Sequence, residues 1–320
     1  MSTLFGGGAF RGSRSLAARP IKPLSDVLRA HGAVVSADAL PLSVRGTLRS
    51  GDYAIDGRIS SQFFTGLMLT LPFLSGTSTL RWTPPVGSLG YIRLTEAILC
   101  EHGVRLERIE NGYRIPGDQT ARHMPPVAQG DWSCAAPMLI LGAIGGSVTV
   151  YGLDPDSIQP DRKILTVLEQ CGAHVQVGAQ SVTVSKGTLT GFKCSGADAP
   201  DLVPVLAVLA CASEGDSVLY RLERLRYKES DRFSAICRLL SSLGADYETE
   251  RGDTIVIHGC GSVKGGVADV PPDHRMVMAA ALLSACSASA VTVPHAQCVR
   301  KSYPNFFDDF ISLGGQIDAI

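Results

Sequence analysis

The sequence predicts an α/β fold of two domains, built from repeats of about 70 residues that each have the order β-α-β-α-β-β. Two recurring patterns support this fold: helices that end in glycine, and small apolar helices that begin with a polar residue. The length adds a third argument, because 320 residues exceed one typical domain of roughly 100–150 residues. Stacked units of this kind would bury their apolar helices and leave their sheets on the outside.

The first pattern is a helical stretch that ends in glycine before a short strand. Successive glycines are 69 to 72 residues apart, and they are Gly32, Gly103, Gly172, Gly244 and Gly314. Glycine readily adopts the left-handed conformation that stops a helix and turns the chain into a strand. After most of these glycines two strands are expected, as in HVQVG followed by SVTVSKG.

The second pattern is a polar helix start, a small apolar helix, a turn with Gly or Ser, and a β-branched strand. It occurs at residues 60–82, 131–152, 201–222 and 273–294. In the second half of the chain, helices are therefore expected to start near Asp131, Asp201, Asp231 and Asp273. Pro125-Pro126 interrupts the pattern, so the predicted domains are residues 1–127 and 128–320.

Composition and charge exclude several classes of protein. The formal net charge is −1 and Lys or Arg form no long run, so neither nucleic acid nor an anionic membrane surface is an expected partner. No apolar stretch reaches the ~20 residues of a membrane-spanning helix. The nine cysteines form no C-x-x-C pair and no metal-site spacing with histidines, which predicts free thiols, no metal and a reducing, cytoplasmic location.

Polar helix starts are the candidate sites, because the N-terminus of a helix attracts anions. Ser60-Ser61-Gln62 opens one apolar helix and suits a phosphate group, although a plain serine N-cap is the simpler interpretation. Arg19 and Lys301 are isolated cations near prolines, and either could be ordinary surface charge.

A charged segment precedes the helix that ends at Gly244. The i, i+4 spacing of Lys228 and Arg232 would place both cations on one side, with Glu229 beside them. Glu229 could then donate a proton while held among cations. The alternative is a solvated helix start with a routine ion pair.

Two further helix starts carry carboxylates. Asp273 is a plausible cap for a helix whose first turn holds His274 and Arg275, and cations at a positive helix end suggest a bound anion. A surface turn with solvated side chains is the alternative. Asp201 follows a proline at another helix start, where an ordinary first-turn acid is the commonest interpretation.

Together these segments resemble the signatures of the 5-enolpyruvylshikimate-3-phosphate synthase family. RISSQFFTGLMLTLP is similar to the family's S-S-Q helix, and RYKESDRFSAICRLLSSLGA to its K-E-[ST]-[DN]-R segment. DHRMVMAAAL is similar to its D-H-R-M-A-M helix, and VRKSYPNFFDDFISLGG to its K-[ST]-[FY]-P segment. The resemblance implies the family's inverse α/β fold, in which each of two domains contains three βαβαββ units.

The resemblance also implies an activity: transfer of the enolpyruvyl group of phosphoenolpyruvate to the 5-hydroxyl of shikimate-3-phosphate, with release of phosphate and without metal or organic cofactor. Asp201 would be the general base and Glu229 the proton donor. The residues implied to bind shikimate-3-phosphate are Ser60, Ser61, Ser88, Tyr91, Asp201 and Lys228. Those implied to bind phosphoenolpyruvate are Arg19, Gln62, Arg232, Arg275 and Lys301. All are expected to meet at one cleft.

The chain departs from the family at its start. Aligned on SRSLAARPIKPLSDVLRAHGA, it has no counterpart of the G-S-K-S-x-S-x-R and N-A-G-T segments, so the first domain is expected to lack about one and a half repeats. That domain is expected to self-associate or to be complemented by another segment. The alternative to a working transferase is a non-catalytic remnant or a shikimate-3-phosphate-binding protein. A related transferase for nucleotide amino sugars would not be expected to carry K-E-S-D-R and D-H-R-M in this form.

Overall fold

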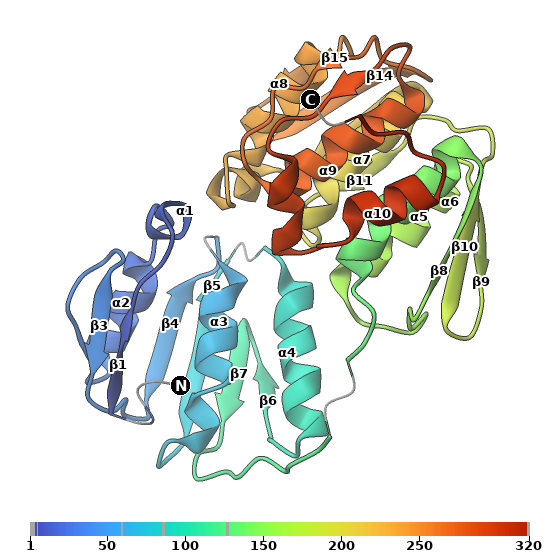
Figure 1. Cartoon of the computed structure of the whole chain (residues 1–320). Helices are drawn as coiled ribbons and strands as arrows, with labels where there is room; N and C mark the ends of the chain where they lie inside the picture. Colours follow the sequence, from blue (N-terminus) through green and yellow to red (C-terminus); the bar gives the residue numbers. More distant parts are fainter. Residues whose placement is uncertain (1–3, 5, 59, 85–86, 126–127, 319–320) are drawn as a thin grey trace. The chain divides into compact units, whose positions relative to one another are not determined.

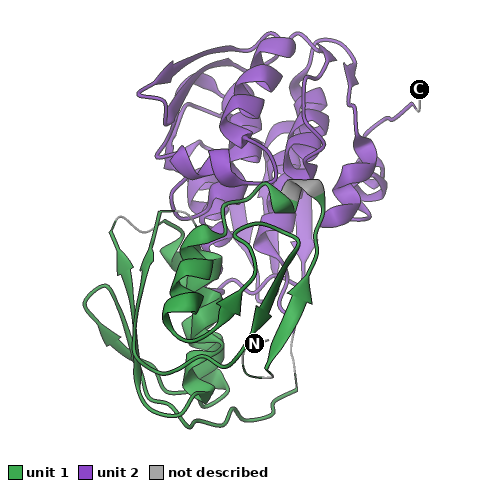
Figure 2. Cartoon of the chain, turned by 90° about the vertical axis from the view of Figure 1, so that its left-hand side faces the viewer, with its two compact units in different colours: residues 1–127 green, residues 128–320 purple. Residues whose placement is uncertain are grey.

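A computed structural model describes residues 4, 6–58, 60–84, 87–125 and 128–318. The chain divides into two compact units, Met1–Val127 and Ala128–Ile320 (Figure 2). Pro126, part of the predicted boundary, lies outside the described residues, and that each unit folds independently stays a prediction. In the described part of the chain, no helix is long and apolar enough to cross a membrane.

The first unit contains two antiparallel or mixed sheets and the helices packed on them (Figure 1). Its elements are β1 Gly7–Phe10, α1 Arg14–Ala17, α2 Lys22–Ala30, β2 Val34–Val35, β3 Leu42–Arg45, β4 Asp52–Asp56, α3 Ser61–Met68, the short 3-10 helix η2 Leu71–Phe73, β5 Ser78–Thr83, α4 Leu89–Glu101, β6 Glu107–Ile109 and β7 Gly112–Ile115. The strand orders are β1-β3-β2 and β4-β5-β7-β6. The core of this unit includes Phe64 and Met68 of α3 and Leu80 of β5, each fully buried.

The second unit is larger and contains three sheets. Its elements up to α7 are α5 Trp132–Gly145, β8 Ser147–Tyr151, η3 Pro160–Lys163, α6 Ile164–Gln170, β9 His174–Val177, β10 Ser181–Ser185, β11 Lys193–Ser195, η4 Pro200–Leu202 and α7 Val203–Cys211. The remaining elements are β12 Glu214–Tyr220, η5 Glu223–Tyr227, α8 Arg232–Ser242, β13 Asp246–Glu250, β14 Thr254–Cys260, β15 Gly266–Val267, α9 His274–Leu283, η6 Ser284–Cys286, β16 Val291–Thr292, η7 Ala296–Lys301 and α10 Phe306–Ser312. The strand orders are β8-β10-β9, β11-β12-β14-β13 and β15-β16.

Three helices, α5, α7 and α9, form the centre of the second unit and pack against one another. Every residue of α7 and of α9 is buried, which explains why their sequences are apolar or small on all sides. Because the helix sides are buried in this way, the polar residues of these segments concentrate at the helix N-termini. This packing places the candidate functional residues at the ends of a rigid core.

The predicted glycine stops are confirmed. Each of the five glycines follows a helix and has φ between 73° and 102°, the left-handed region that a residue with a Cβ atom enters only at a cost. One detail is wrong: residues 315–318, after Gly314, form no strand. The backbone there follows the α10 helix with hydrogen bonds from Gly314 and Gly315 back to Ile311 and Phe310, which closes the helix without starting a sheet.

The repeat itself appears in full at residues 52–115 and 193–260. In both, the first strand runs parallel to the second, and the second pairs antiparallel with the fourth, which pairs antiparallel with the third. The predicted helix starts are also confirmed, since Asp131, Asp231 and Asp273 cap α5, α8 and α9. Asp201 lies in the 3-10 turn that leads into α7.

Candidate active site

The candidate site residues of the second unit follow two parallel strand pairs, β11–β12 and β15–β16, at their carboxyl ends. Parallel strands end at the same edge of a sheet, so the helices that follow them begin side by side. Asp201 follows β11, and Lys228 and Glu229 follow β12. Arg275 follows β15 and Lys301 follows β16. The two pairs belong to different sheets, and the ion pairs of Arg275 with Asp201 and of Lys301 with Glu229 join them across more than 70 positions of sequence.

Arg232, the first residue of α8, is the centre of this group, and its side chain is only 1% exposed. Its Nε and Nη2 donate to the two carboxylate oxygens of Asp273, at 2.8 and 3.1 Å. Nη1 donates to Asp201 Oδ1 at 2.7 Å, and Nη2 donates also to Glu229 Oε2 at 2.9 Å. Burial alone would lower the pKa of Arg232, but Asp273 and Asp201 outweigh burial and raise it. Four of its five N–H groups are thus used by carboxylates of the chain.

Asp201 lies between three cations. Its Oδ1 is 2.7 Å from Arg232 Nη1 and 3.2 Å from Lys228 Nζ, and its Oδ2 is 3.7 Å from Arg275 Nη2. Burial alone would raise the pKa of the Asp201 carboxyl, but Lys228, Arg232 and Arg275 hold that pKa well below its usual range. Asp201 is therefore a carboxylate at neutral pH and accepts hydrogen bonds. Burial lowers the pKa of the Lys228 amine, although Asp201 opposes this shift.

Glu229 is held at both carboxylate oxygens by separate cations. Oε1 accepts from Lys301 Nζ at 2.9 Å, and Oε2 accepts from Arg232 Nη2 at 2.9 Å. Lys301 is more than half exposed, whereas Glu229 is four-fifths buried, so the pair lies at the edge of the buried network. Glu229 is thus the carboxylate through which this network reaches the surface.

Asp273 connects the starts of two helices. Its Oδ1 accepts from the backbone N–H of Arg275 at 3.0 Å and so caps α9, while its Oδ2 accepts from Ser230 Oγ at 3.0 Å. The same carboxylate holds Arg232 at the start of α8. The neighbouring His274 is also buried, and burial lowers its pKa to about 4, so this imidazole is neutral at physiological pH.

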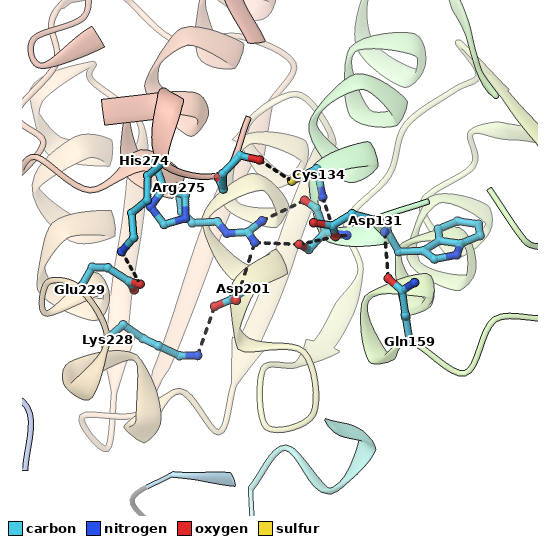
Figure 3. A network of polar contacts seen from close by, with 12 residues as sticks. Asp131, Cys134, Gln159, Asp201, Lys228, Glu229, His274 and Arg275 are labelled. Carbon is cyan, nitrogen blue, oxygen red and sulfur yellow. Dashed lines mark hydrogen bonds and ion pairs between the residues drawn. The ribbon is translucent and has the colours of Figure 1, made fainter. Parts of the chain in front are cut away.

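Arg275 is anchored on the first turn of α5, as Figure 3 shows. Its Nη1 donates to the carbonyl of Ser133 at 2.9 Å and its Nη2 to the Ser133 hydroxyl at 2.7 Å. Nearby, the Cys134 thiol donates to the carbonyl of Ser302, next to Lys301 (Figure 3). Within the described residues, Arg275 Nε and Ser302 Oγ are buried and have no hydrogen-bond partner.

The first unit repeats this arrangement with uncharged residues. Ser60 follows β4 and caps α3, where its hydroxyl accepts from the Gln62 N–H at 3.2 Å, and Ser61 is buried in the first turn. Ser88 follows β5, is buried, and begins α4 with φ of 57°, and Tyr91 lies one turn further. The strands β4 and β5 are parallel, so both hydroxyl-bearing starts lie at one sheet edge. Arg19 lies after α1 and is partly buried.

The predicted site residues fall into two groups of six. Those of the second unit form one continuous network: Asp201, Lys228, Glu229, Arg232, Arg275 and Lys301. Those of the first unit lie at helix starts or turns: Arg19, Ser60, Ser61, Gln62, Ser88 and Tyr91. That both groups meet in one cleft, and that each residue binds the substrate assigned to it, stay predictions.

Two sequence-based interpretations change. Lys228 is not on a helix face with Arg232, because α8 begins only at Arg232 and Lys228 is extended; the two cations meet because both contact Asp201 Oδ1. The solvated alternatives for this segment and for the start of α9 are also wrong, since Arg232, Asp273 and Arg275 are buried. For Ser60, the plain N-cap is what the structure contains.

Three residues contribute to this network without being predicted as part of it from the sequence. Ser133 contacts Arg275, and Ser230 contacts Asp273. A serine near a helix start gives no sequence signal for such a distant partner. The sequence predicts Asp273 only as a cap, although the two basic residues that follow it indicate that it lies among cations. Among the described residues, this cluster included, no group of three or more His, Cys, Asp or Glu side chains is placed to hold a metal ion.

The arrangement is suited to anions and to proton transfer. Four cations, Lys228, Arg232, Arg275 and Lys301, face three carboxylates, Asp201, Glu229 and Asp273, which leaves one positive charge in excess at the N-termini of helices. Asp201 and Glu229 are held in place by cations on either side. Such a site can neutralise a multiply charged substrate and present two carboxylates to it.

Comparison with known proteins agrees with this chemistry. The sequence profile described as EPSP synthase (3-phosphoshikimate 1-carboxyvinyltransferase) matches residues 1–310. A 3-phosphoshikimate 1-carboxyvinyltransferase of Clostridium kluyveri is 38% identical over 314 residues, which cover 97% of this chain and 73% of that protein. The protein of the same name from Aeropyrum pernix is 41% identical over 313 residues, covering 97% of this chain and 72% of its own.

The same fold occurs among solved structures. An EPSP synthase from Acinetobacter baumannii superimposes with a TM-score of 0.78 at 23% identity, covering 96% of this chain and 73% of that one. This likeness shows the two-domain inverse α/β fold that the family resemblance implied and that agrees with the βαβαββ repeats. From the profile and the relatives together, the chain belongs to the EPSP synthase family.

Proposed function

We propose that this protein is a 3-phosphoshikimate 1-carboxyvinyltransferase, which moves the enolpyruvyl group of phosphoenolpyruvate to the 5-hydroxyl of shikimate-3-phosphate and releases phosphate. The observation that carries the proposal is the single network of Asp201, Glu229 and four cations in a chain of this family. Both substrates are multiply charged anions that repel each other, so a site that joins them must supply several cations.

Asp201 is the general base in this proposal. Its carboxylate accepts the proton of the 5-hydroxyl, whose oxygen then attacks the carbon of phosphoenolpyruvate that carries the phosphate ester. Lys228, Arg232 and Arg275 hold the pKa of Asp201 low, which makes it a weak base by itself. Bound substrate anions would offset those three charges and raise the pKa of Asp201 toward the value that proton abstraction needs.

Glu229 is the proton donor. In its protonated form Glu229 gives its proton to the methylene carbon of phosphoenolpyruvate, which becomes a methyl group, and the hydroxyl oxygen attacks the neighbouring carbon, where positive character develops. When phosphate leaves the tetrahedral adduct, the Glu229 carboxylate takes a proton back from that methyl group, and the C=CH2 double bond of the enolpyruvyl group re-forms. Lys301 and Arg232 fix the two oxygens of Glu229, so the acid is held in one orientation. The serine hydroxyls at the starts of α3 and α4 are the proposed partners of the shikimate-3-phosphate phosphate group.

The test combines binding and turnover on the full chain. Isothermal titration with shikimate-3-phosphate measures binding, and release of inorganic phosphate with both substrates measures turnover. Glu229→Gln is expected to lower kcat by about 10²–10⁴-fold while the affinity for shikimate-3-phosphate stays within a few-fold, because only a proton-transfer group is lost.

The matched control is Glu107→Gln, which neutralises an exposed glutamate paired with Arg114 in the first unit and leaves kcat unchanged. Binding of shikimate-3-phosphate without any phosphate release by the unmodified chain would favour the alternative, a non-catalytic shikimate-3-phosphate-binding protein. Absence of both binding and turnover would contradict the proposal.

A further inference from the structure

Helix α5 carries a proline in its interior, at Pro137. In an α-helix the N–H of residue 137 would donate to the carbonyl of residue 133, four positions earlier. Proline has no N–H, and its ring crowds that same carbonyl. The carbonyl of Ser133 therefore lacks its regular helical donor, although it lies in a helix that is almost entirely buried.

The side chain of Arg275 supplies the missing donor. Arg275 Nη1 donates to the Ser133 carbonyl at 2.9 Å and Nη2 donates to the Ser133 hydroxyl at 2.7 Å, across 142 positions of sequence. All three groups are buried. Two bonds from different nitrogens determine both the position and the plane of the guanidinium, which one bond could not do.

The Ser133 hydroxyl is itself oriented. It donates to Asp131 Oδ1 at 2.7 Å, so its lone pairs are left for Arg275 (Figure 3). Asp131 also accepts from the backbone N–H groups of Ser133 and Cys134, which fixes the carboxylate as the cap of α5. The chain of contacts thus runs from Asp131 through Ser133 to Arg275, whose Nη2 is 3.7 Å from Asp201.

We propose that Ser133 and Pro137 are positioning residues for the enolpyruvyl transfer: Pro137 frees the Ser133 carbonyl, and the carbonyl and hydroxyl of Ser133 hold the Arg275 guanidinium against Asp201. This inference rests on the proposed function, in which Arg275 binds phosphoenolpyruvate. Without the Ser133 contacts, Arg275 would turn on its flexible side chain and would pay an ordering cost each time the anion binds. The cost should appear in KM for phosphoenolpyruvate rather than in kcat.

Ser133→Ala removes the hydroxyl and keeps the Asp131 cap on the backbone. It is expected to raise KM for phosphoenolpyruvate about tenfold and to leave kcat within about threefold, because one hydrogen bond to a charged group is lost. Ser133→Thr, which retains the hydroxyl, should restore KM. The matched control is Ser234→Ala: Ser234 Oγ donates at 2.8 Å to Asp231, the cap of α8, but contacts no arginine of the site. Equal effects of the two alanine variants would overturn the proposal.

Pro137→Ala returns an N–H to the helix, which then competes for the Ser133 carbonyl. It is expected to raise KM for phosphoenolpyruvate about threefold while stabilising the fold, since an interior proline destabilises a helix. An unchanged KM would show that the proline has no part in positioning Arg275.

A double-mutant cycle separates this inference from the proposed function. If Ser133 acts through Arg275, Ser133→Ala in an Arg275→Lys background should change KM by less than about twofold. The same cycle measured by urea unfolding needs no turnover. If the two substitutions are coupled in unfolding free energy but the unmodified chain releases no phosphate, only the proposed function is contradicted. If the two substitutions are not coupled, the positioning role is contradicted.

Discussion

Residues 52–115 and residues 193–260 have the same order of strands and helices and the same strand directions, but different chemistry at equivalent positions. After the first strand of the repeat, one has Ser60 and the other has Asp201. After the second strand, one has Ser88 and the other has Lys228 and Glu229. The comparison shows that the repeat specifies where side chains meet, at the carboxyl ends of two parallel strands, and leaves their chemistry open.

The two units that contain these regions also differ in how they stabilise charge. At the end of β4, Asp56 pairs with Arg58, whose side chain is 69% exposed. In the second unit, Asp273 pairs with Arg232, and both side chains are 1% exposed. An exposed pair contributes little to stability, whereas removing one member of a buried pair leaves an uncompensated charge. The first pair is replaceable, and the second is part of the core.

The largest expected effect follows from this difference. Asp273→Ala should lower the unfolding free energy of the second unit by about 3–5 kcal/mol, because buried Arg232 loses the carboxylate that accepts two of its hydrogen bonds. Asp56→Ala should change the unfolding free energy of the first unit by less than about 1 kcal/mol. The two tryptophans make the comparison direct: Trp132 reports the second unit in a Trp82→Phe background, and Trp82 the first in a Trp132→Phe background, during urea unfolding.

Asp273→Asn is the control for the cap, since an asparagine oxygen still accepts from the N–H of Arg275. The unfolding free energy of Asp273→Asn should lie between those of the unmodified chain and Asp273→Ala. Equal costs for Asp273→Ala and Asp56→Ala would show that burial does not distinguish the two pairs.

A smaller effect is expected from acid. The folded pKa of Asp201 lies below that of an ordinary carboxyl, so ionised Asp201 contributes stability above about pH 4, and that contribution is lost as pH falls further toward the folded pKa. The unfolding free energies of the unmodified chain and Asp201→Asn should therefore differ at pH 7 and converge below about pH 4.

Ser60, the equivalent residue of the first unit, does not titrate. The unfolding free energies of Ser60→Ala and of the unmodified chain are therefore expected to differ by an amount that does not depend on pH between about 3 and 7. An Asp201→Asn difference that stays constant over the same range would contradict the ion-pair account of Asp201.

The smallest effect concerns the cap itself. Ser60→Ala should cost the first unit about 1 kcal/mol, since the hydroxyl accepts one hydrogen bond from the N–H of Gln62. The unfolding of the second unit, followed by Trp132, should not change. A cost above about 2 kcal/mol would show that Ser60 stabilises more than the start of α3.

Much of this fold was readable in the sequence, because the deciding signals are local. The glycines that stop helices need only their own backbone conformation, and the aspartates that cap α5, α8 and α9 accept from N–H groups two or three residues away. The period of about 70 residues follows from repeating such local signals. The resemblance to the family rests largely on the same helix starts, so all twelve candidate site residues can be named by motif, whereas their contacts cannot.

The contacts themselves depended on tertiary structure. Lys228 and Arg232 meet through Asp201, about 30 residues earlier in the chain, and not through a shared helix face. Ser133 holds Arg275 across 142 residues, in part because a proline frees a carbonyl, and no local pattern reveals which side chain will reach it. The physical reason is that local hydrogen bonds define where helices begin and end, whereas the partner of a buried charge is determined by which helix ends the packed core brings together.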